Sequence, residues 1–375
     1  MARTEPPQPG VTRGTPASAA RPMEPPGVAR PAVPLPGFVR EMGIPRLLIA
    51  LFLFALLAVG VATHMDLRGL IADSITRVGR NGILVLALLP AIQGGLGLNF
   101  GLPLGIICGL VGCVISLNAG IHGVPGLLFA TGIGLGLAIP AGIAYGWLLN
   151  RTRGQEMMVG TYLGFAIVSM MSVFWLLAPF KNPNLVWAIG GRGLRTTLTL
   201  GGIYDKVLDR WLEVTIAGVR IPTGTHVVFG ALCFLVWLFF RTRMGITIAA
   251  ARSNPKFARA AGISDERTRI QASVISTVLG AVGIVVFSQS YGFVQLYTAP
   301  LLMAFPAIAC ILIGGATVTR ATIGHVIVGT LLFQSILTVA LPVTSQVIQG
   351  DISETARLII QNGMILYALT RLGRT

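Results

Sequence analysis

The chain has 375 residues, of which 54% are hydrophobic and 11% are charged, against roughly 25% charged residues in an ordinary soluble domain. Long continuous apolar stretches exclude a large soluble core and, because they do not alternate with polar residues, a transmembrane β-barrel. The formal net charge of +15 does not indicate nucleic-acid binding, because the basic residues fall in short segments between apolar stretches. Composition therefore predicts an all-α polytopic membrane protein.

Residues 1–45 are predicted to be a disordered, proline-rich cytoplasmic tail. They hold eleven of the 22 prolines, and no apolar stretch that would make a signal peptide precedes residue 47. Such a segment favours a solvated, partly polyproline II conformation. A docking segment for another protein is the alternative.

The rest of the chain, 46–375, is predicted to be a transmembrane domain with about ten spans. The expected spans, in chain order, are 47–63, 83–97, 103–117, 127–149, 161–179, 226–240, 270–289, 299–315, 323–341 and 356–369. The four cysteines lie within these stretches without metal-ligand spacing and are expected to be small hydrophobic residues.

The distribution of basic residues predicts that both termini are cytoplasmic. With that orientation the inner segments hold 18 lysines and arginines and the outer segments hold 10, of which six lie in the long loop around 181–224. The positive-inside rule favours this arrangement. It leaves 180–225 as an outer loop and 241–269 as a cytoplasmic loop.

Two similar stretches indicate an internal repeat. Pro90-Ala91-Ile92 and Pro306-Ala307-Ile308 each precede a paired glycine within a glycine-rich span, and transporters are often built from repeats with broken helices near the midplane. Polar and aromatic residues near these breaks are candidates for a substrate path. The candidates are Gln93, Asn99, Phe100 and Phe305. The alternative is that the polar ones form hydrogen bonds between helices.

The segment RTRMGITIAAARSNPKFARAAGISDERTR, at 241–269, carries seven basic and two acidic residues in an otherwise apolar chain. Asn254 followed by Pro255 is typical of a helix start, and Gly262 is typical of a helix end. Ser264 is expected to cap the next helix. The pattern predicts a short helix, a break and a second helix.

The predicted short helix suits insertion into a groove on a soluble partner. It combines the aromatic Phe257 with alanines and basic residues. A basic loop lying on anionic lipid is the alternative.

This segment resembles the cytoplasmic loop of permease subunits of ABC importers, in the group that handles simple sugars, nucleosides and branched-chain amino acids. The matching residues are Arg241, Arg243, Gly245, Asn254, Pro255, Ala258, Arg259, Ala261, Gly262 and Ile263. The stretches NRTRGQEMMVGTYLGFAIV (150–168) and ILIGGATVTRATIGHVIVGTLLF (311–333) are similar to other segments of the same family.

The resemblance implies the transport subunit of an importer, without catalytic residues, bound cofactor or metal of its own. ATP and Mg²⁺ would be held by a separate cytoplasmic ATP-binding subunit, and the chain lacks the phosphate-loop motif. A second permease subunit, an extracytoplasmic solute-binding protein and membrane lipid are the other implied partners. The ATPase would grip a coupling helix made by Asn254, Pro255, Lys256, Phe257, Ala258, Arg259, Ala261 and Gly262.

Two other functions remain as alternatives. A secondary transporter driven by an ion gradient should carry buried charged residues at the midplane, and the predicted spans hold almost none. An intramembrane enzyme would need a nucleophile or metal motif, such as Gly-x-Ser-x-Gly or His-Glu-x-x-His, and none is present.

Overall fold

The computed structural model describes residues 44–180, 182–183, 185–187, 193–211, 213–216, 219–347 and 352–370. The described residues all belong to one compact unit, Met42–Thr375. Most of the expected proline-rich tail, 1–43, lies outside the described residues, as does 371–375.

Each of the ten expected spans falls on one helix or on two consecutive helices. These are α2 (Ile44–Ala62), α3 and α4 (Leu67–Leu86, Leu88–Gln93), α5 (Leu102–Ala119), α6 (Gly123–Arg151), α7 (Glu156–Leu177), α9 (Thr223–Arg241), α12 (Asp265–Tyr291), α13 and α14 (Thr298–Leu302, Ala304–Ile313), α15 (Ile323–Val347) and α16 (Ile352–Thr370). Within the described part of the chain, seven segments are long and apolar enough to cross a membrane. An all-α polytopic membrane protein is confirmed, whereas the number of spans and the side of each terminus stay predictions.

The second span was expected at 83–97, but the structure has a helix well before residue 83. Helix α3 begins at Leu67, and its candidate span runs on to Gln93. Arg77 and Arg80 lower the average hydropathy of this stretch, although Ser74, Val78 and Gly79 on the same helix are buried. The apolar residues that continue the helix to Gln93 carry this segment over the hydropathy threshold of a membrane span despite the two arginines.

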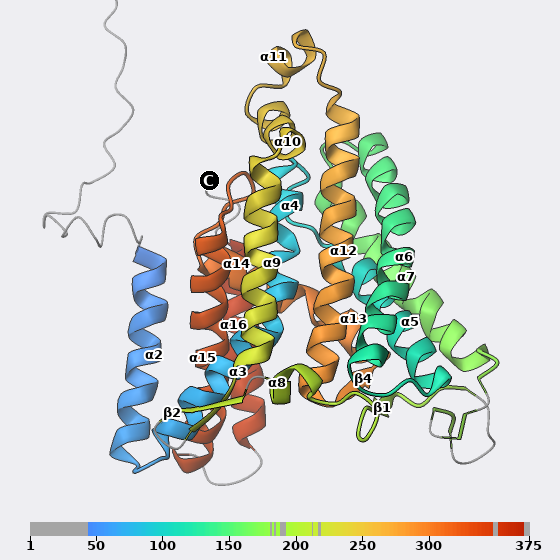
Figure 1. Ribbon diagram of the computed structural model, residues 1–375. Helices are drawn as coiled ribbons and strands as arrows, with labels where there is room; N and C mark the ends of the chain where they lie inside the picture. Colours follow the sequence, from blue (N-terminus) through green and yellow to red (C-terminus); the bar gives the residue numbers. More distant parts are fainter. Residues whose placement is uncertain are drawn as a thin grey trace, which may run out of the picture. The chain divides into compact units, whose positions relative to one another are not determined.

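Helix α12 lies at the centre of the unit, packed against α5 and α6 (Figure 1). Small residues permit the close approach, as their small-xxx-small spacing predicts. An ideal Cβ on Gly105 would lie 2.6 Å from the carbonyl oxygen of Thr277, and one on Gly142 would lie 2.7 Å from the Cα of Val274. Backbones therefore meet at these crossings with no room for a side chain.

Replacing Gly109 with alanine should destabilise the bundle by about 1–3 kcal/mol, the usual cost of overpacking a core. A Cβ there would lie 2.3 Å from Cγ2 of Ile284 and 2.4 Å from the carbonyl oxygen of Ala281. Gly132→Ala on α6 is the control, because its Cβ would meet nothing within 4 Å, and alanine favours a helix over glycine. Thermal unfolding in detergent should show a lower midpoint for Gly109→Ala only.

The two ends of the bundle differ. Helices α10 (Arg243–Ser253) and α11 (Pro255–Ala260) lie at one end, here called the α11 end (Figure 1). The opposite end, called the α8 end, carries α8 (Val207–Trp211) and two short antiparallel strand pairs, β1 (Thr197–Thr199) with β4 (Phe293–Gln295), and β2 (Glu213–Ile216) with β3 (Val219–Pro222). These strands were not predicted.

The internal repeat predicts two glycine pairs, Gly94-Gly95 and Gly314-Gly315. These pairs end α4 and α14 in the same way. After α4, the N–H of Gly94, Gly95 and Leu96 donate to the carbonyls of Pro90, Ile92 and Ala91. After α14, Gly314 and the two residues that follow it donate from their N–H groups to the carbonyls four, three and five positions earlier in the chain. This is the same pattern as after α4. Gly95 and Gly315 both have positive φ, of 72° and 96°, as this type of helix end requires.

Candidate functional site

Helix α11 has the form that the sequence predicts. The Asn254 side chain accepts a hydrogen bond from the N–H of Phe257 at 3.0 Å, and Pro255 is the first residue of the helix. Gly262, at φ 77°, ends it, and the Ser264 side chain accepts from the N–H of Arg267 as α12 begins. These caps satisfy backbone groups that would otherwise lack partners.

The side chains of α11 present an apolar knob among basic residues. Phe257 is 67% exposed, whereas Ala258 is buried against the rest of the loop. Lys256, Arg259, Ala261 and Gly262 are also exposed. A large exposed aromatic on a short capped helix is what a protein partner could bury.

A buried ion pair joins the base of this loop to the spans. Arg269, only 8% exposed, donates to Glu156 Oε1 at 2.7 Å and to Asn150 Oδ1 at 2.9 Å. It also donates to the carbonyl oxygens of Gly95 and Leu149. One side chain of α12 thus contacts α6, α7 and the loop after α4.

The arginines nearest to Glu156 in the sequence, Arg151 and Arg153, are not its partners. Arg153 instead contacts Asp265 at 2.8 Å, and Arg151 stacks on the ring of Trp147. Sequence reasoning missed Arg269 because it counted this residue with the other basic residues of the loop. The available signal was its position, directly before the apolar run that continues α12.

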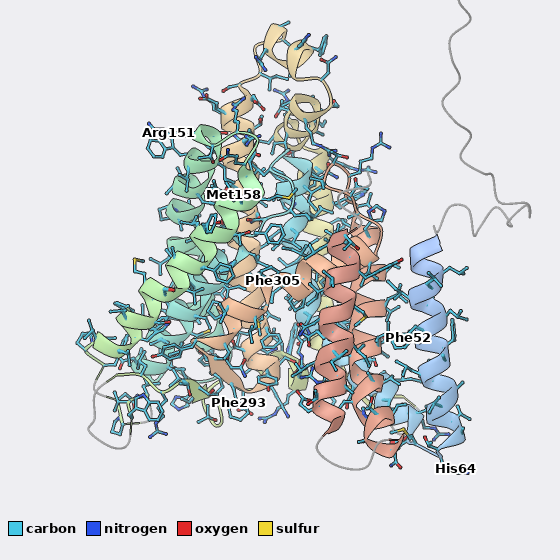
Figure 2. All side chains as sticks on the ribbon, turned by 180° about the vertical axis from the view of Figure 1, so that it is seen from behind. Phe52, His64, Arg151, Met158, Phe293 and Phe305 are labelled. Carbon is cyan, nitrogen blue, oxygen red and sulfur yellow. The ribbon has the colours of Figure 1, made fainter. Side chains whose placement is uncertain are left out.

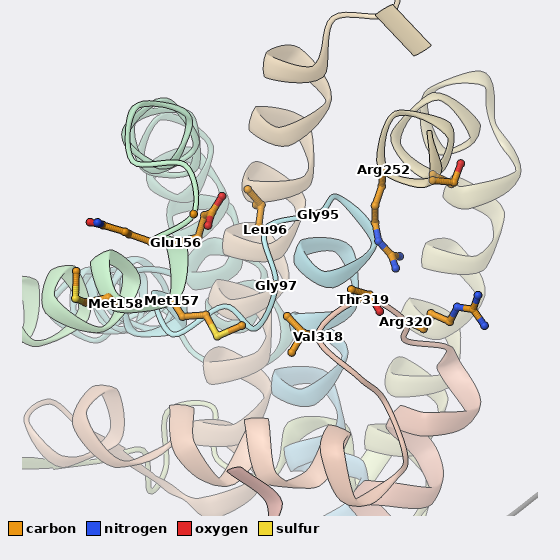
Figure 3. A pocket seen from close by; sticks show the side chains of 14 residues that line it. Gly95, Leu96, Gly97, Glu156, Met157, Met158, Arg252, Val318, Thr319 and Arg320 are labelled. Carbon is orange, nitrogen blue, oxygen red and sulfur yellow. The ribbon is translucent and has the colours of Figure 1, made fainter. Parts of the chain in front are cut away.

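A large cavity of about 1070 Å³ opens beside α10 at the α11 end. Its lining comes from four separate segments, Gly95–Gly97, Gly154–Met158, Ala249–Ser253 and Val318–Arg320. Arg252 and Arg320 lie on one side and Glu156 on the other (Figure 3). Burial, and then the nearby charge of Arg320, lowers the pKa of Arg252 from its usual value.

Further along α7 lies a smaller, apolar space, here called the aromatic pocket. It is lined by Phe100, Pro103, Thr161, Gly164, Phe165, Val168, Pro300, Leu301, Ala304 and Phe305. The rings of Phe100 and Phe305 meet edge to face with centroids 5.9 Å apart, and Phe165 lies 6.4 Å from Phe305. Two predicted path residues, 205 positions apart, are thus in contact.

One face of α7 lines both the large cavity and the aromatic pocket. Met157 and Met158 line the first, and Thr161, Phe165 and Val168 line the second, at three- and four-residue steps along one helix. Figure 2 shows Phe305 between the level of Met158, near the α11 end, and that of Phe293, near the α8 end. The two spaces therefore follow one another along the bundle.

The other two predicted path residues contact protein groups. Asn99 is 3% exposed; its amide donates to Ser276 Oγ at 2.7 Å and accepts from Tyr145 Oη at 2.9 Å. Gln93 donates to the carbonyl oxygen of Ala321 at 2.7 Å. These three bonds link segments that are 46 to 228 positions apart in the sequence.

Apolar spans, a capped helix at one end and two spaces lined by one helix face fit a multi-pass membrane transport protein. Residues 43–369 match the family described as "Branched-chain amino acid transport system / permease component". The chain belongs to this family of ABC-type permeases, which are transport components and not enzymes, and which lie in the inner membrane in bacteria.

One curated relative is the "Autoinducer 2 import system permease protein LsrC" of Enterobacter sp. (strain 638). The two are 30% identical over 188 residues, which cover 48% of this chain and 54% of the relative. The chain thus matches about half the length of that protein. No solved structure matches the chain significantly.

Proposed function

We propose that this chain is the permease subunit of an ATP-driven importer that moves a small polar solute, a simple sugar or a nucleoside, by alternating access. The observation that carries the proposal is that one face of α7 lines both the large cavity and the aromatic pocket. Family membership supports the transport role. The aromatic pocket has a volume of only about 10 Å³, so it would have to widen to admit a solute, as alternating access requires, and its ring faces would then pack against a sugar-like molecule.

Coupling is assigned to α11. A cytoplasmic ATP-binding subunit, which holds ATP and Mg²⁺, would bury Phe257 and contact Arg259. Movement of α11 would reach the spans through α12, because Arg269 at the start of α12 binds Glu156 at the start of α7. The large cavity would then be the cytoplasmic half of the path.

Two further partners complete the importer. A second permease subunit, the same chain or a paralogue, would lie against α7 and close the path beside the aromatic pocket. An extracytoplasmic solute-binding protein would deliver the solute at the α8 end. Both assignments rest on family membership together with the position of the pocket.

Replacing Phe305 with alanine should reduce solute uptake by about tenfold, because it removes the ring that contacts both Phe100 and Phe165. A tenfold change corresponds to roughly 1.4 kcal/mol of interaction free energy. Phe174→Ala is the control, since Phe174 is 44% exposed on α7, the helix that also carries Phe165, and lies outside the pocket. Uptake of labelled sugars and nucleosides into cells expressing each variant is the measurement. Equal uptake by both variants would remove the aromatic pocket from the path.

A further inference from the structure

A second, separate cavity lies toward the α8 end, among α3, α12, α14, α15 and α16. It has a volume of about 330 Å³, within the usual range for small-molecule sites. Three arginines line it, Arg77, Arg80 and Arg357. Charged residues on membrane helices are costly and usually functional. We call this space the arginine cavity.

The positive charge of the arginine cavity is not balanced by its own lining. No carboxylate is among its lining residues, and within the described ranges neither Arg77 nor Arg80 has a carboxylate at ion-pair distance. Arg357 differs, because it bonds Glu354 at 2.9 Å. Asp73 and Asp209 line an adjoining cavity beside these arginines but form no ion pair with them among the described residues, so both guanidinium groups still lack a direct carboxylate partner.

Arg80 is held in place by aromatic rings. Its guanidinium carbon lies 5.4 Å from the ring centroids of both Phe287 and Tyr291, a cation–π geometry. Its Nε is buried, and no described protein group accepts a hydrogen bond from it. A buried donor without an acceptor costs stability unless a ligand satisfies it.

The rest of the lining suits an anion with a polar body. Gln295, Gln334 and Gln361 supply amide groups, and Asn81 follows Arg80 on α3. Amides can both donate to and accept from hydroxyl or headgroup oxygens. The combination of arginines and amides favours an oxyanion group, a carboxylate or a phosphate, over a neutral sugar.

A route from the α8 end reaches this cavity. An adjoining cavity of about 680 Å³ shares Arg77, Arg80 and Tyr291 with it and is also lined by α8 residues. Ser290, only 5% exposed, lines that outer cavity, and its Oγ has no acceptor among the described residues. A second unsatisfied donor thus lies on the way in.

We propose that Arg77 and Arg80 bind an oxyanion, the phosphate or carboxylate of a small solute or of an anionic lipid headgroup, in a site distinct from the aromatic pocket. The two sites share no lining residue, although both contact α13 and α14. Binding can therefore be measured without any transport assay and does not depend on the proposed substrate.

The test uses the full chain in lipid nanodiscs. Inorganic phosphate is titrated by calorimetry into discs of phosphatidylcholine alone, and melting temperatures are compared with discs of equal phosphatidylcholine and phosphatidylglycerol. Arg80→Gln and Arg77→Gln remove one charge each. Arg68→Gln is the matched control, because Arg68 is exposed on the same helix and lines neither cavity. Should Arg80→Gln fail to fold, Arg77→Gln carries the test, because the ring contacts around Arg80 stay intact.

A soluble anion is supported if phosphate binding weakens by about tenfold in each of the two cavity variants and does not weaken in Arg68→Gln. A tenfold loss is the loss expected for one charge-assisted hydrogen bond. A lipid headgroup is supported if phosphatidylglycerol raises the melting temperature only when Arg77 and Arg80 are both present, and phosphate does not bind. If neither probe has an effect that depends on these two arginines, or if Arg68→Gln loses as much, the proposal is wrong.

Discussion

Replacing Phe257 with aspartate is expected to reduce ATP-driven uptake at least about thirtyfold, the loss that corresponds to a binding hot spot of about 2 kcal/mol. The side chain is 67% exposed on α11 and contributes little to the bundle itself. An aspartate in its place would put a charge into the groove that the ATP-binding subunit offers. The thermal midpoint of the isolated chain should not change.

The measurement compares uptake and ATP hydrolysis in proteoliposomes that hold the permease and its ATP-binding subunit. Phe257→Leu keeps an apolar knob of similar reach and should retain most of the coupling. Arg259→Asp, two residues along the same exposed helix, should behave like Phe257→Asp. Full uptake by both aspartate variants would mean that α11 does not couple the ATPase to the spans.

Replacing Arg269 with methionine is expected to destabilise the protein by about 1–3 kcal/mol, the cost of leaving hydrogen-bonding groups without a partner, because Glu156 is 17% exposed and lines the large cavity. Arg269 is 8% exposed, and its loss would leave Glu156 without its cation and the carbonyl of Gly95 without a donor. Unfolding in detergent, followed as a thermal midpoint, measures this effect.

The double variant Arg269→Met with Glu156→Gln should recover part of the loss, because the uncompensated carboxylate is then gone. Arg153→Met is the matched control, since Arg153 pairs with Asp265 while 43% exposed, and exposed pairs contribute less than about 1 kcal/mol. Equal destabilisation by Arg153→Met and Arg269→Met would show that the buried pair contributes no more to stability than the exposed pair.

Local features of the loop at 241–269 could be predicted from sequence, because each depends on neighbouring residues. Asn254, Gly262 and Ser264 cap or end helices as their types suggest, and the structure has those caps. Apolar stretches also locate the helices, since burial in lipid or protein requires continuous hydrophobic sequence. The coupling role of α11 remains a proposal.

Contacts between distant segments could not be predicted. Phe100 and Phe305 both stood out beside glycine-rich breaks, yet only the fold brings their rings together. Arg80 lies before the expected second span in the sequence, and only the fold shows that its guanidinium lies beside the rings of Phe287 and Tyr291. One available signal was missed: Gly160 and Gly164 have small-xxx-small spacing, and they let α7 approach Tyr145 and Phe100.

The most direct test of the account is the energy source for uptake. Proteoliposomes containing the purified chain and its ATP-binding subunit, with solute-binding protein outside and ATP inside, are assayed with all ion gradients collapsed by ionophores. We predict that uptake continues, stops when ATP is replaced by a non-hydrolysable analogue, and is lost with Phe257→Asp. Uptake by the chain alone, driven by an ion gradient and indifferent to ATP, would contradict the proposed importer and favour a secondary transporter.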